Sequence, residues 1–336
     1  MKLTDFEYYL PKELIAQYPL EKREQARLMV VDRQTKEITH DVFSNLCHYL
    51  PKASSLVLND SKVVPARLLG KREKTGGAVE VFLLNKLSDG YSYRALLRPL
   101  KRIKIDEKIM FNGGALYAQL KDASNRIVRF NKRNIGTYLK KIGHMPLPPY
   151  IKRPDEPLDR EYYQTVFARH EGSVASPTAG LHFTKPLLSE LKVKGHKTEK
   201  ITLHINYATF NAVKVEDITQ HHMHTEVYAV SPRVWQALRT VKEQGKKIVA
   251  VGTTSCRALE TVAQSGKLKS ETDIFIYPGF NFQMTDALLT NFHFPQSTLL
   301  MLVCAFGTSD LVMKAYAEAI HLKYRFYSYG DCMLII

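Results

Sequence analysis

The stretch KKIVAVGTTSCRALE, residues 246–260, is the part of the sequence that decides the fold class. Its apolar beginning has the length and composition of a buried strand, and a helix is predicted from Arg257 to Ala263. Gly252 and three hydroxyl residues lie between the two, at a strand-to-helix junction. Junctions of this kind, repeated along a chain, favour a largely parallel sheet or an α/β barrel.

The same alternation of strands and helices extends over the C-terminal half of the chain. Further strands are predicted at GSVAS (172–176), at residues 200–205 and at DIFIY (273–277). Further helices are predicted over residues 185–193, 233–243 and 310–323. We therefore expect an α/β fold with an α/β-barrel-like main domain.

A different pattern occupies residues 67–134. Short runs of alternating character are separated there by the turn signals GG, DG and NGG: AVEVFLL, YSYRALL, EKIMF, ALYAQL and RIVRF. They predict a small antiparallel β-barrel domain, and five prolines between Pro146 and Pro157 mark a boundary after it. Because the apolar run at 55–59 is expected to join the larger sheet, we predict that the β-barrel is inserted into a discontinuous main domain of residues 1–66 and 135–336.

Composition and charge describe a globular chain that attracts polyanions. Of the 336 residues, 45% are hydrophobic and 24% are charged, close to globular averages, which argues against a disordered chain. Lys and Arg number 48 against 33 Asp and Glu, so nucleic acid is the first partner to consider, although a generally basic proteome would give the same balance. Many of these cations lie in the β module. The competing interpretation of such a group is a solvated face.

The sequence carries no recognisable targeting or membrane signal. Its N-terminal residues include acidic side chains and no apolar run of signal-peptide length, and no later stretch approaches the ~20 apolar residues of a membrane span. The four cysteines are scattered, which argues against a disulfide framework and against cysteine-bound zinc. We expect a cytoplasmic protein without a membrane partner.

Three polar segments lie at predicted strand-to-helix junctions, where α/β folds bind ligands. They are SPTAGLHFT (176–184), VGTTSCRALE (251–260) and TNFHFPQST (290–298). In the second, N–H groups at a helix start would favour an anion, whereas the competing interpretation is that its hydroxyl residues only cap the helix. For the first, the competing interpretation is a structural loop with a core histidine.

Motifs for metals and nucleotides are weak or missing in the sequence. The cluster HHMH (221–224), followed by Glu226, could suggest a metal site. Zinc needs three or four converging ligands, and neither an HExxH motif nor a cysteine pair accompanies the cluster, so we expect no metal. GxGxxG and GxxxxGK[ST] do not occur, which argues against the common dinucleotide and P-loop sites.

Nine blocks of the sequence resemble, in order, the signature blocks of the tRNA ribosyltransferase-isomerase family, from about Asp5 to Ile336. They are LVLNDSKVVPARLLG (56–70), MPLPPYI (145–151), YYQTVFA (162–168), ASPTAGLHFT (175–184), TLHINYATF (202–210), HHMHTEVY (221–228), VGTTSCRALE (251–260), LLTNFHFPQSTLLMLV (288–303) and SYGDCMLI (328–335). The chain departs from the family pattern at Asn206, Tyr207 and Ala208, where a glycine-bearing HVGxGTF is expected. Smaller departures are Ser176, Cys256, Ala258 and Cys332.

The resemblance implies an enzyme that transfers the ribosyl part of S-adenosylmethionine to 7-aminomethyl-7-deazaguanine at the tRNA wobble position. The ribosyl group is also isomerised, which gives epoxyqueuosine and releases adenine and methionine. S-adenosylmethionine is then a co-substrate, and no cofactor is implied. The competing functions are a non-catalytic RNA-binding protein and a metal-dependent hydrolase built on HHMH and His293.

Candidate site residues come from the matching blocks and from the basic β module. Carboxylates and histidines could serve as proton acceptor and donor, and the sequence leaves both roles open among Asp60, His182, His204, Glu226 and His293. The substrate-binding candidates are Thr178, Gly180, Thr253, Thr254, Arg257 and Asn291. The tRNA should dock across the domain junction of a monomeric enzyme, with its target nucleotide unstacked into the α/β pocket. The expected phosphate contacts are Arg67, Lys71, Arg72, Lys101, Arg102 and Lys104.

Overall fold

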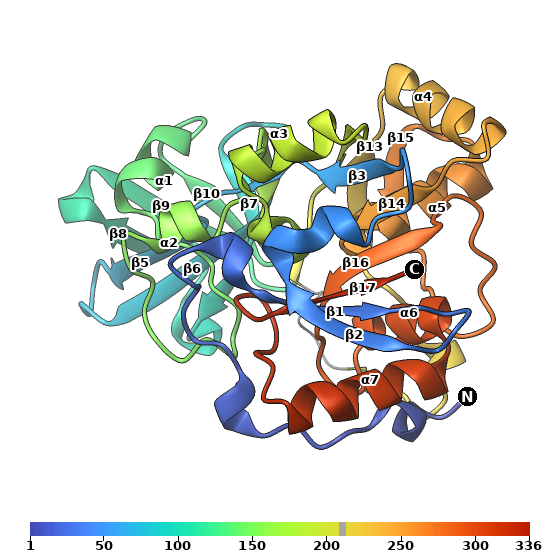
Figure 1. Cartoon of the computed structure of the whole chain (residues 1–336). Coiled ribbons are helices and arrows are strands. Elements are labelled where there is room, and N and C mark those ends of the chain that lie inside the picture. The colour runs from blue at the N-terminus through green and yellow to red at the C-terminus, as the bar shows by residue number, and fades with distance from the viewer. Residues whose placement is uncertain (208–212) are drawn as a thin grey trace.

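The computed structural model describes residues 1–207 and 213–336, and Figure 1 shows two parts side by side. One part is a large mixed sheet with helices against it, and the other is a small β-barrel coloured cyan and green. The α/β class and the small antiparallel β-barrel expected from the sequence are therefore confirmed. The exact domain limits given by the sequence pattern stay a prediction.

Nine strands form the main sheet, in the order β15, β13, β12, β3, β14, β16, β17, β1 and β2. Their bounds are β1 Arg27–Val31, β2 Ile38–Val42, β3 Ser55–Asn59, β12 Lys197–Leu203, β13 Glu226–Ala229, β14 Ile248–Val251, β15 Lys269–Thr272, β16 Ala287–Asn291 and β17 Cys332–Ile335. The central strands β12, β3, β14 and β16 are parallel neighbours, whereas β17 is antiparallel to β16 and parallel to β1. The main domain is thus a mixed sheet with β15 and β2 as its edge strands.

Both faces of this sheet are buried, because side chains of successive residues point to opposite sides of a strand. In β1, Met29 and Val31 join one core, and Leu28 and Val30 join the other. The first core includes side chains of helices α4 (Pro232–Glu243), α5 (Thr253–Ser265), α6 (Thr298–Gly307) and α7 (Ser309–His321). The second includes side chains of α3 (Lys185–Val193) and the 3-10 helix η4 (Phe43–His48). Burial on both faces explains why β14 (IVAV) is apolar throughout and why β3 and β16 are mostly apolar, whereas β12 begins with exposed polar residues.

The small barrel is closed by antiparallel pairs in the order β10, β7, β6, β5, β8 and β9. Its strands are β5 Arg67–Arg72, β6 Ala78–Lys86, β7 Ser92–Arg98, β8 Lys108–Phe111, β9 Leu116–Asp122 and β10 Ile127–Phe130. Gly70 of β5 lies so close to the Phe111 ring that an added Cβ would be 2.6 Å from it. A larger side chain at this position would therefore push apart the packed interior of the barrel.

A segment that we call the strap, residues 144–159, leads from the barrel back to the main sheet. It follows α1 (Gly136–Ile142) and runs into the short helix α2 (Asp159–Tyr162). Its first residue, His144, forms an antiparallel bridge with Arg67 at the start of β5. Beyond the strap, β11 (His170–Ser173) pairs in parallel with β4 (Ser61–Val63), next to the point where the chain enters the barrel.

Two predicted strands differ from the structure, and the last predicted helix is present. The strand predicted at GSVAS (172–176) is shifted toward the N-terminus, because β11 spans His170–Ser173. The strand predicted at DIFIY (273–277) is wrong, because β15 ends at Thr272 and the following residues are irregular. Ile276 is buried in the first core, so the run is apolar because it packs against helices and not because it pairs in the sheet. The helix predicted over 310–323 is α7, and Thr308 with φ 64 separates it from α6.

Within residues 1–207 and 213–336, no single helix is long and apolar enough to cross a membrane. The bent pair α6 and α7, which meet at 114°, reaches the required length and composition only when the two are taken together. Most of the side chains of α6 are buried in the first core.

Candidate functional site

A cavity of about 600 Å³ opens at the carboxyl ends of β14 and β16, and we call it the main cavity. Gly252 and Thr253 follow β14 at its wall, and Asn291 ends β16 there. Other walls come from the N-terminal segment, through Lys12, and from the strap, through Tyr150. Ligands of open α/β sheets bind outside the carboxyl ends of the strands, so this is the position where such a fold is expected to hold its substrate.

The three polar segments singled out in the sequence meet at this cavity, although more than 100 residues separate the first from the last. Five of the predicted site residues line it: Thr178, Thr253, Thr254, Asn291 and His293. The segments converge because η7 (Thr178–His182) contacts β16 and α5 begins directly after the neighbouring strand β14. The shared location supports a common ligand site, while the role of each residue stays a prediction.

The start of helix α5 forms one wall. Its N-cap is Gly252, with φ 87 and ψ 152, and no side chain caps the helix. The N–H groups of Thr253, Thr254 and Ser255 precede the first intrahelical bond, from the Cys256 N–H to the Gly252 carbonyl at 3.2 Å. The Thr254 hydroxyl accepts a hydrogen bond from the Asn59 amide at 3.1 Å. The hydroxyl residues therefore leave the first N–H groups to a ligand, and these groups with the helix dipole favour an anion.

Two buried polar atoms at the cavity have no hydrogen-bond partner among the described residues. They are Oγ of Ser176 and Oδ1 of Asn291. The Asn291 amide nitrogen, by contrast, donates to the Tyr327 carbonyl at 3.1 Å and lies 3.3 Å from Nε2 of His182. The side chain is thus held in place with its oxygen unused. Buried polar atoms are paired in nearly all folded proteins, so a ligand is the natural partner for these two.

An aromatic wall closes the cavity on the side of the strap and the C-terminal segment. The Phe294 and Tyr327 rings are stacked, with centroids 3.6 Å apart and an interplanar angle of 24°. Tyr150 packs against both, and its hydroxyl is 2.5 Å from Oγ of Ser328. Phe294 remains 37% exposed, which leaves ring surface for a ligand. Such a wall suits a flat heteroaromatic base or a cation.

His293 is the histidine that lines the main cavity among the described residues. Its Nε2 is 2.7 Å from Oγ1 of Thr290, and its carbonyl accepts a hydrogen bond from the Tyr8 hydroxyl. Burial lowers the pKa of His293 to about 3, because the charged imidazolium would be desolvated. The ring is therefore neutral at physiological pH, with a free lone pair, but it would hold an added proton only weakly.

His182 and Gly180 lie behind the cavity wall. His182 lines a separate cavity of about 20 Å³, together with Arg23 and Tyr329. Burial lowers the pKa of His182 to about 4, so this imidazole is also neutral. Gly180 packs so closely that an added Cβ would be 2.9 Å from the Phe167 ring. Neither residue lines the main cavity, and the contact of His182 with Asn291 suits a supporting position.

Asp60 and His204 form a second polar group beside β4 and β11. Asp60 accepts a hydrogen bond from the Thr202 hydroxyl at 2.6 Å, and Nε2 of His170 lies 3.7 Å from its other oxygen. Burial is the main cause that lowers the pKa of His204, followed by the charge of His170. Neither Asp60 nor His204 lines the main cavity, so their predicted catalytic roles would require a different site or a rearrangement.

Glu226 and Arg257 pair with each other in the interior. Both side chains are less than 5% exposed, and Nη1 of Arg257 donates to Oε2 of Glu226. Glu226 also accepts a hydrogen bond from the Asn206 N–H at 2.9 Å, and Nε of Arg257 donates to the Ile274 carbonyl at 3.3 Å. The pair thus ties the segment after β12 to α5. It does not line the main cavity, so the structure does not bring these two candidates to the predicted ligand.

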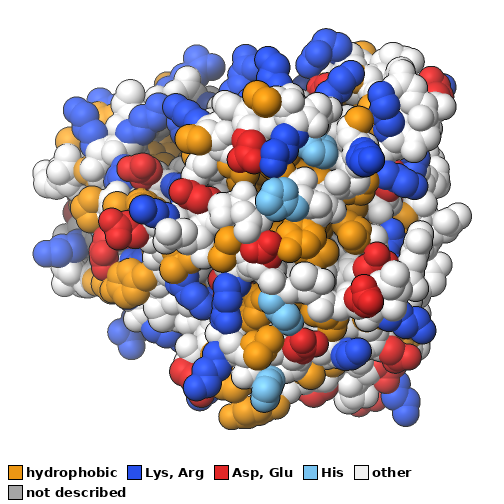
Figure 2. Space-filling view, viewed as in Figure 1, with side chains coloured by type: hydrophobic (Ala, Val, Ile, Leu, Met, Phe, Trp, Pro, Cys, Tyr) orange, Lys and Arg blue, Asp and Glu red, His pale blue; other side chains and the backbone are white. Residues whose placement is uncertain are grey.

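The six cations predicted to contact RNA fall into two groups. Arg67 has an acidic partner in Glu80 at 2.7 Å, and Arg72 forms a bidentate pair with Glu107 at 2.7 and 3.0 Å. The other four are exposed: Lys71, Lys101, Arg102 and Lys104. Figure 2 shows Lys and Arg spread over the barrel side of this face with Asp and Glu among them. The RNA contacts stay a prediction.

The histidine cluster and the described departures Asn206 and Tyr207 do not line the main cavity. No group of three or more His, Cys, Asp or Glu side chains that could hold a metal is found within the part of the chain that the structure describes. The His221 ring packs against Phe275, with centroids 5.4 Å apart. Tyr207 packs against Phe82 of the barrel, with centroids 5.1 Å apart, and Ala208 lies outside the described residues.

Several cavity residues were missed by the sequence analysis. They are Lys12, Gln17, Tyr150, Lys152, Phe294, Tyr327 and Ser328. Phe294 stands inside a segment that was singled out, and Tyr150 stands inside the matching block MPLPPYI, whose prolines were interpreted as a boundary; Lys152 follows directly after this block. Lys12 and Gln17 carry no local signal, because their position depends on how the N-terminal segment crosses the sheet.

Comparisons with known proteins agree over the whole chain. The family model described as "Queuosine biosynthesis protein" matches residues 3–335. The S-adenosylmethionine:tRNA ribosyltransferase-isomerase of Sulfurihydrogenibium sp. is 51% identical over 337 residues, with all of both chains covered. The protein of the same name from Caldanaerobacter subterraneus subsp. tengcongensis is 49% identical over 344 residues, also with full coverage.

A solved structure gives the same result. The crystal structure of S-adenosylmethionine tRNA ribosyltransferase from Thermotoga maritima is 36% identical in sequence and has a TM-score of 0.57. The match covers 99% of this chain and 100% of that one. On this agreement of family model, relatives and solved structure, the chain belongs to the queuosine biosynthesis protein family, among its S-adenosylmethionine:tRNA ribosyltransferase-isomerase enzymes.

Proposed function

We propose that this enzyme transfers the ribosyl part of S-adenosylmethionine to 7-aminomethyl-7-deazaguanine at the tRNA wobble position and isomerises it. The product is epoxyqueuosine in tRNA, and adenine and methionine are released. The observation that carries the proposal is the main cavity, where an uncapped helix start and an aromatic wall face the same space. Family membership supplies the reaction class, and these two features fit the two ends of S-adenosylmethionine.

The methionine carboxylate fits the start of α5. The N–H groups of Thr253 and Thr254 stand at the positive end of the helix dipole and are not used by a side-chain cap. The ammonium group of the same ligand has a suitable acceptor in the unpaired Oδ1 of Asn291. The two polar contacts would fix the amino-acid end of S-adenosylmethionine in one orientation.

The aromatic wall fits the other end of the ligand and the target base. Phe294 and Tyr327 present ring surface to a planar base, which could be the adenine of S-adenosylmethionine or the deazaguanine of the tRNA. The same negative ring faces attract the sulfonium cation. For one base to enter from RNA, its nucleotide must leave the stack, as in other enzymes that modify bases.

His293 is the best placed proton acceptor in this arrangement. The sulfonium makes the neighbouring ribose 5′ C–H bonds acidic, so a neutral imidazole at the cavity could take one of these protons. The resulting ylide expels adenine, which must itself gain a proton. The primary amine of the deazaguanine has to be neutral to attack carbon. We include in the proposal a monomeric enzyme located in the cytoplasm, with S-adenosylmethionine as a co-substrate and no further cofactor.

Adenine release tests the proposal directly. The purified protein is incubated with S-adenosylmethionine and tRNA that carries 7-aminomethyl-7-deazaguanine, and released adenine is measured by chromatography. Adenine should appear only when the tRNA carries the modified base, and the modified nucleoside should gain the mass of the ribosyl group. Binding of tRNA without any adenine release would instead support the non-catalytic RNA-binding alternative.

A further inference from the structure

A second cavity of about 520 Å³ lies between the barrel and the strap, and we call it the junction cavity. On the barrel side it is lined by Arg67 of β5, Phe82 of β6 and Arg98 of β7. On the other side it is lined by much of the strap. Pro149 and Lys152 line both this cavity and the main cavity. The two spaces are therefore neighbours with a common wall.

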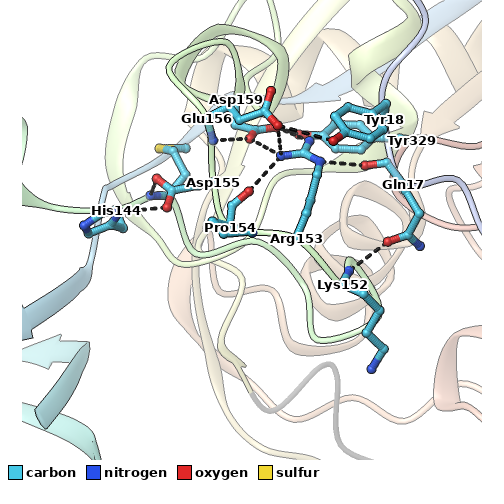
Figure 3. Close-up of polar contacts among 11 residues, drawn as sticks. Gln17, Tyr18, His144, Lys152, Arg153, Pro154, Asp155, Glu156, Asp159 and Tyr329 are labelled. Atoms are coloured by element: carbon cyan, nitrogen blue, oxygen red, sulfur yellow. Dashed lines mark hydrogen bonds and ion pairs between the residues drawn. The ribbon is translucent and has the colours of Figure 1, made fainter. Parts of the chain in front are cut away.

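The common wall is held in place by buried polar contacts, which Figure 3 shows. Asp159 is 1% exposed and accepts two hydrogen bonds from the Arg153 guanidinium, at 2.7 and 2.8 Å. It also accepts from the Tyr329 hydroxyl at 2.8 Å and from the Glu156 N–H at 2.8 Å. The Lys152 N–H donates to Oε1 of Gln17 at 2.7 Å. The strap is thus fixed before any ligand binds.

Near the barrel, a second carboxylate, that of Asp155, also holds the strap in place. Asp155 is 2.8 Å from Nδ1 of His144 and accepts the Met145 N–H at 2.8 Å, as the left side of Figure 3 shows. Across the cavity, Glu80 is paired with Arg67. The acidic side chains that line the junction cavity are therefore both engaged with groups of the protein.

The charge that remains is positive. Arg98 and Lys152 line the junction cavity and are exposed, and neither has an acidic partner within the described part of the chain. The Lys152 ammonium donates only to the Pro149 carbonyl, at 3.1 Å. Two cations without acidic partners, on opposite walls of a cavity, attract an anion such as a phosphate. Leu69, which is 54% exposed, and half-buried Leu96 add apolar surface beside them.

We propose that the junction cavity binds the nucleotide next to the target nucleotide in the RNA strand. Its phosphate lies between Arg98 and Lys152, and its base packs on the apolar surface of Leu69 and Leu96. The inference rests on the proposed function, because it requires that the target base occupies the main cavity. One phosphodiester links neighbouring nucleotides, so a strand whose target base is in one cavity enters the adjoining cavity at the wall that contains Lys152.

The test compares two variants of strand β7. Arg98→Gln removes a cation that lines the junction cavity, and Arg94→Gln removes an exposed cation from the same strand outside it. Both variants lose one charge, so they match in their general effect on RNA attraction. The ligands are a trinucleotide with the modified base in the centre and the free modified nucleoside. Binding is measured by fluorescence anisotropy and by competition, and adenine release is measured separately.

We expect Arg98→Gln to weaken trinucleotide binding about tenfold and to reduce the slope of log affinity against log salt by roughly 0.7, the value for one contact to a single strand. Arg94→Gln should match the wild type, and neither variant should change binding of the nucleoside or of S-adenosylmethionine. Lys152→Gln gives a second variant that should weaken trinucleotide binding and lower its salt slope as Arg98→Gln does; because Lys152 also lines the main cavity, this variant is compared only in trinucleotide binding. Thermal unfolding of all variants confirms that they are folded.

The possible failures are distinguishable. Equal trinucleotide affinity for Arg98→Gln and Arg94→Gln, with normal adenine release by the wild type, would refute the junction site and leave the proposed function intact. A selective loss of trinucleotide affinity in Arg98→Gln, with no adenine release by the wild type, would keep the RNA site and refute the proposed function. A loss in Arg98→Gln that is equally large with the free nucleoside would also refute the junction site.

Discussion

The two glycines at the ends of α5 allow the proposed S-adenosylmethionine site to be tested with one helix as its own control. Gly252 is the N-cap at the main cavity, with φ 87 and ψ 152, a backbone region that is almost restricted to glycine. Gly266 is the C-cap at the far end of the helix, in the left-handed region with φ 69 and ψ −4. Alanine at either position is strained, but only the first position faces the proposed ligand.

The size of each effect follows from the local geometry. A Cβ added at Gly252 would be 3.6 Å from Cβ of Ala179, an ordinary contact, so the cost is backbone strain of about 1–3 kcal/mol. At Gly266 an added Cβ meets nothing within 4 Å, and the left-handed backbone costs about 1–2 kcal/mol. If strain turns the first N–H groups away from a bound carboxylate, about 1–2 kcal/mol of binding is lost, a five- to thirtyfold change in affinity.

The assay measures urea unfolding and calorimetric binding of S-adenosylmethionine for both variants. We expect Gly252→Ala and Gly266→Ala to be destabilised by similar amounts, and only Gly252→Ala to lose affinity for S-adenosylmethionine. If Gly252→Ala were destabilised and still bound S-adenosylmethionine within twofold of Gly266→Ala, the start of α5 would not hold the carboxylate. The reasoning from the uncapped helix start would then be refuted.

Three further predictions concern buried ionisable side chains. Asp159→Ala leaves the Arg153 guanidinium without its carboxylate and should cost about 3–5 kcal/mol in unfolding free energy. Hydrogen bonds hold the pKa of Asp159 below its usual range despite burial. The stability that Asp159 contributes to the wild type should therefore be complete above about pH 4 and disappear as the pH falls through that lowered pKa. Glu226→Gln should destabilise the protein by a similar amount, since it leaves Arg257 buried and unpaired, with S-adenosylmethionine affinity of the folded fraction unchanged in calorimetry. His293→Gln should abolish most adenine release, and unchanged release would remove His293 as the proton acceptor. The pKa of His293 is about 3 in the folded protein, so the wild type should lose stability as the pH falls below about 6.5, where the unfolded chain takes up a proton. The variant lacks this group and should lose less stability over the same range.

Local sequence patterns were sufficient to predict the elements whose ends are marked by their own residues. Helix α3 has the predicted bounds of 185–193, because Thr184 caps it and Pro186 starts it. The barrel was predicted because its strands are short and separated by glycine turns. DIFIY failed because an apolar run that packs against helices has the same composition as a strand, and only tertiary contacts separate the two.

The candidate site was predicted only in part. Thr253, Asn291 and their neighbours stand at strand ends, and the topology of a parallel sheet brings such ends together. Glu226 and Arg257 stand in equally polar blocks, yet they face each other in the interior. Pairing of two charges across the core depends on distant segments, so the sequence pattern could not separate a catalytic carboxylate from a structural one.

The charges around the main cavity bear on how the proposed reaction proceeds. S-adenosylmethionine enters as a sulfonium cation, whereas the charged side chains that line the cavity within the described residues are Lys12 and Lys152, which are also cations. Loss of a proton from the ribose 5′ carbon turns the sulfonium into a net neutral ylide, and such surroundings favour that loss of charge. An imidazole with a pKa of about 3 does not keep the proton it takes. It passes the proton on readily, and the departing adenine needs one, so His293 could serve both transfers and account for a cavity lining without a carboxylate among the described residues.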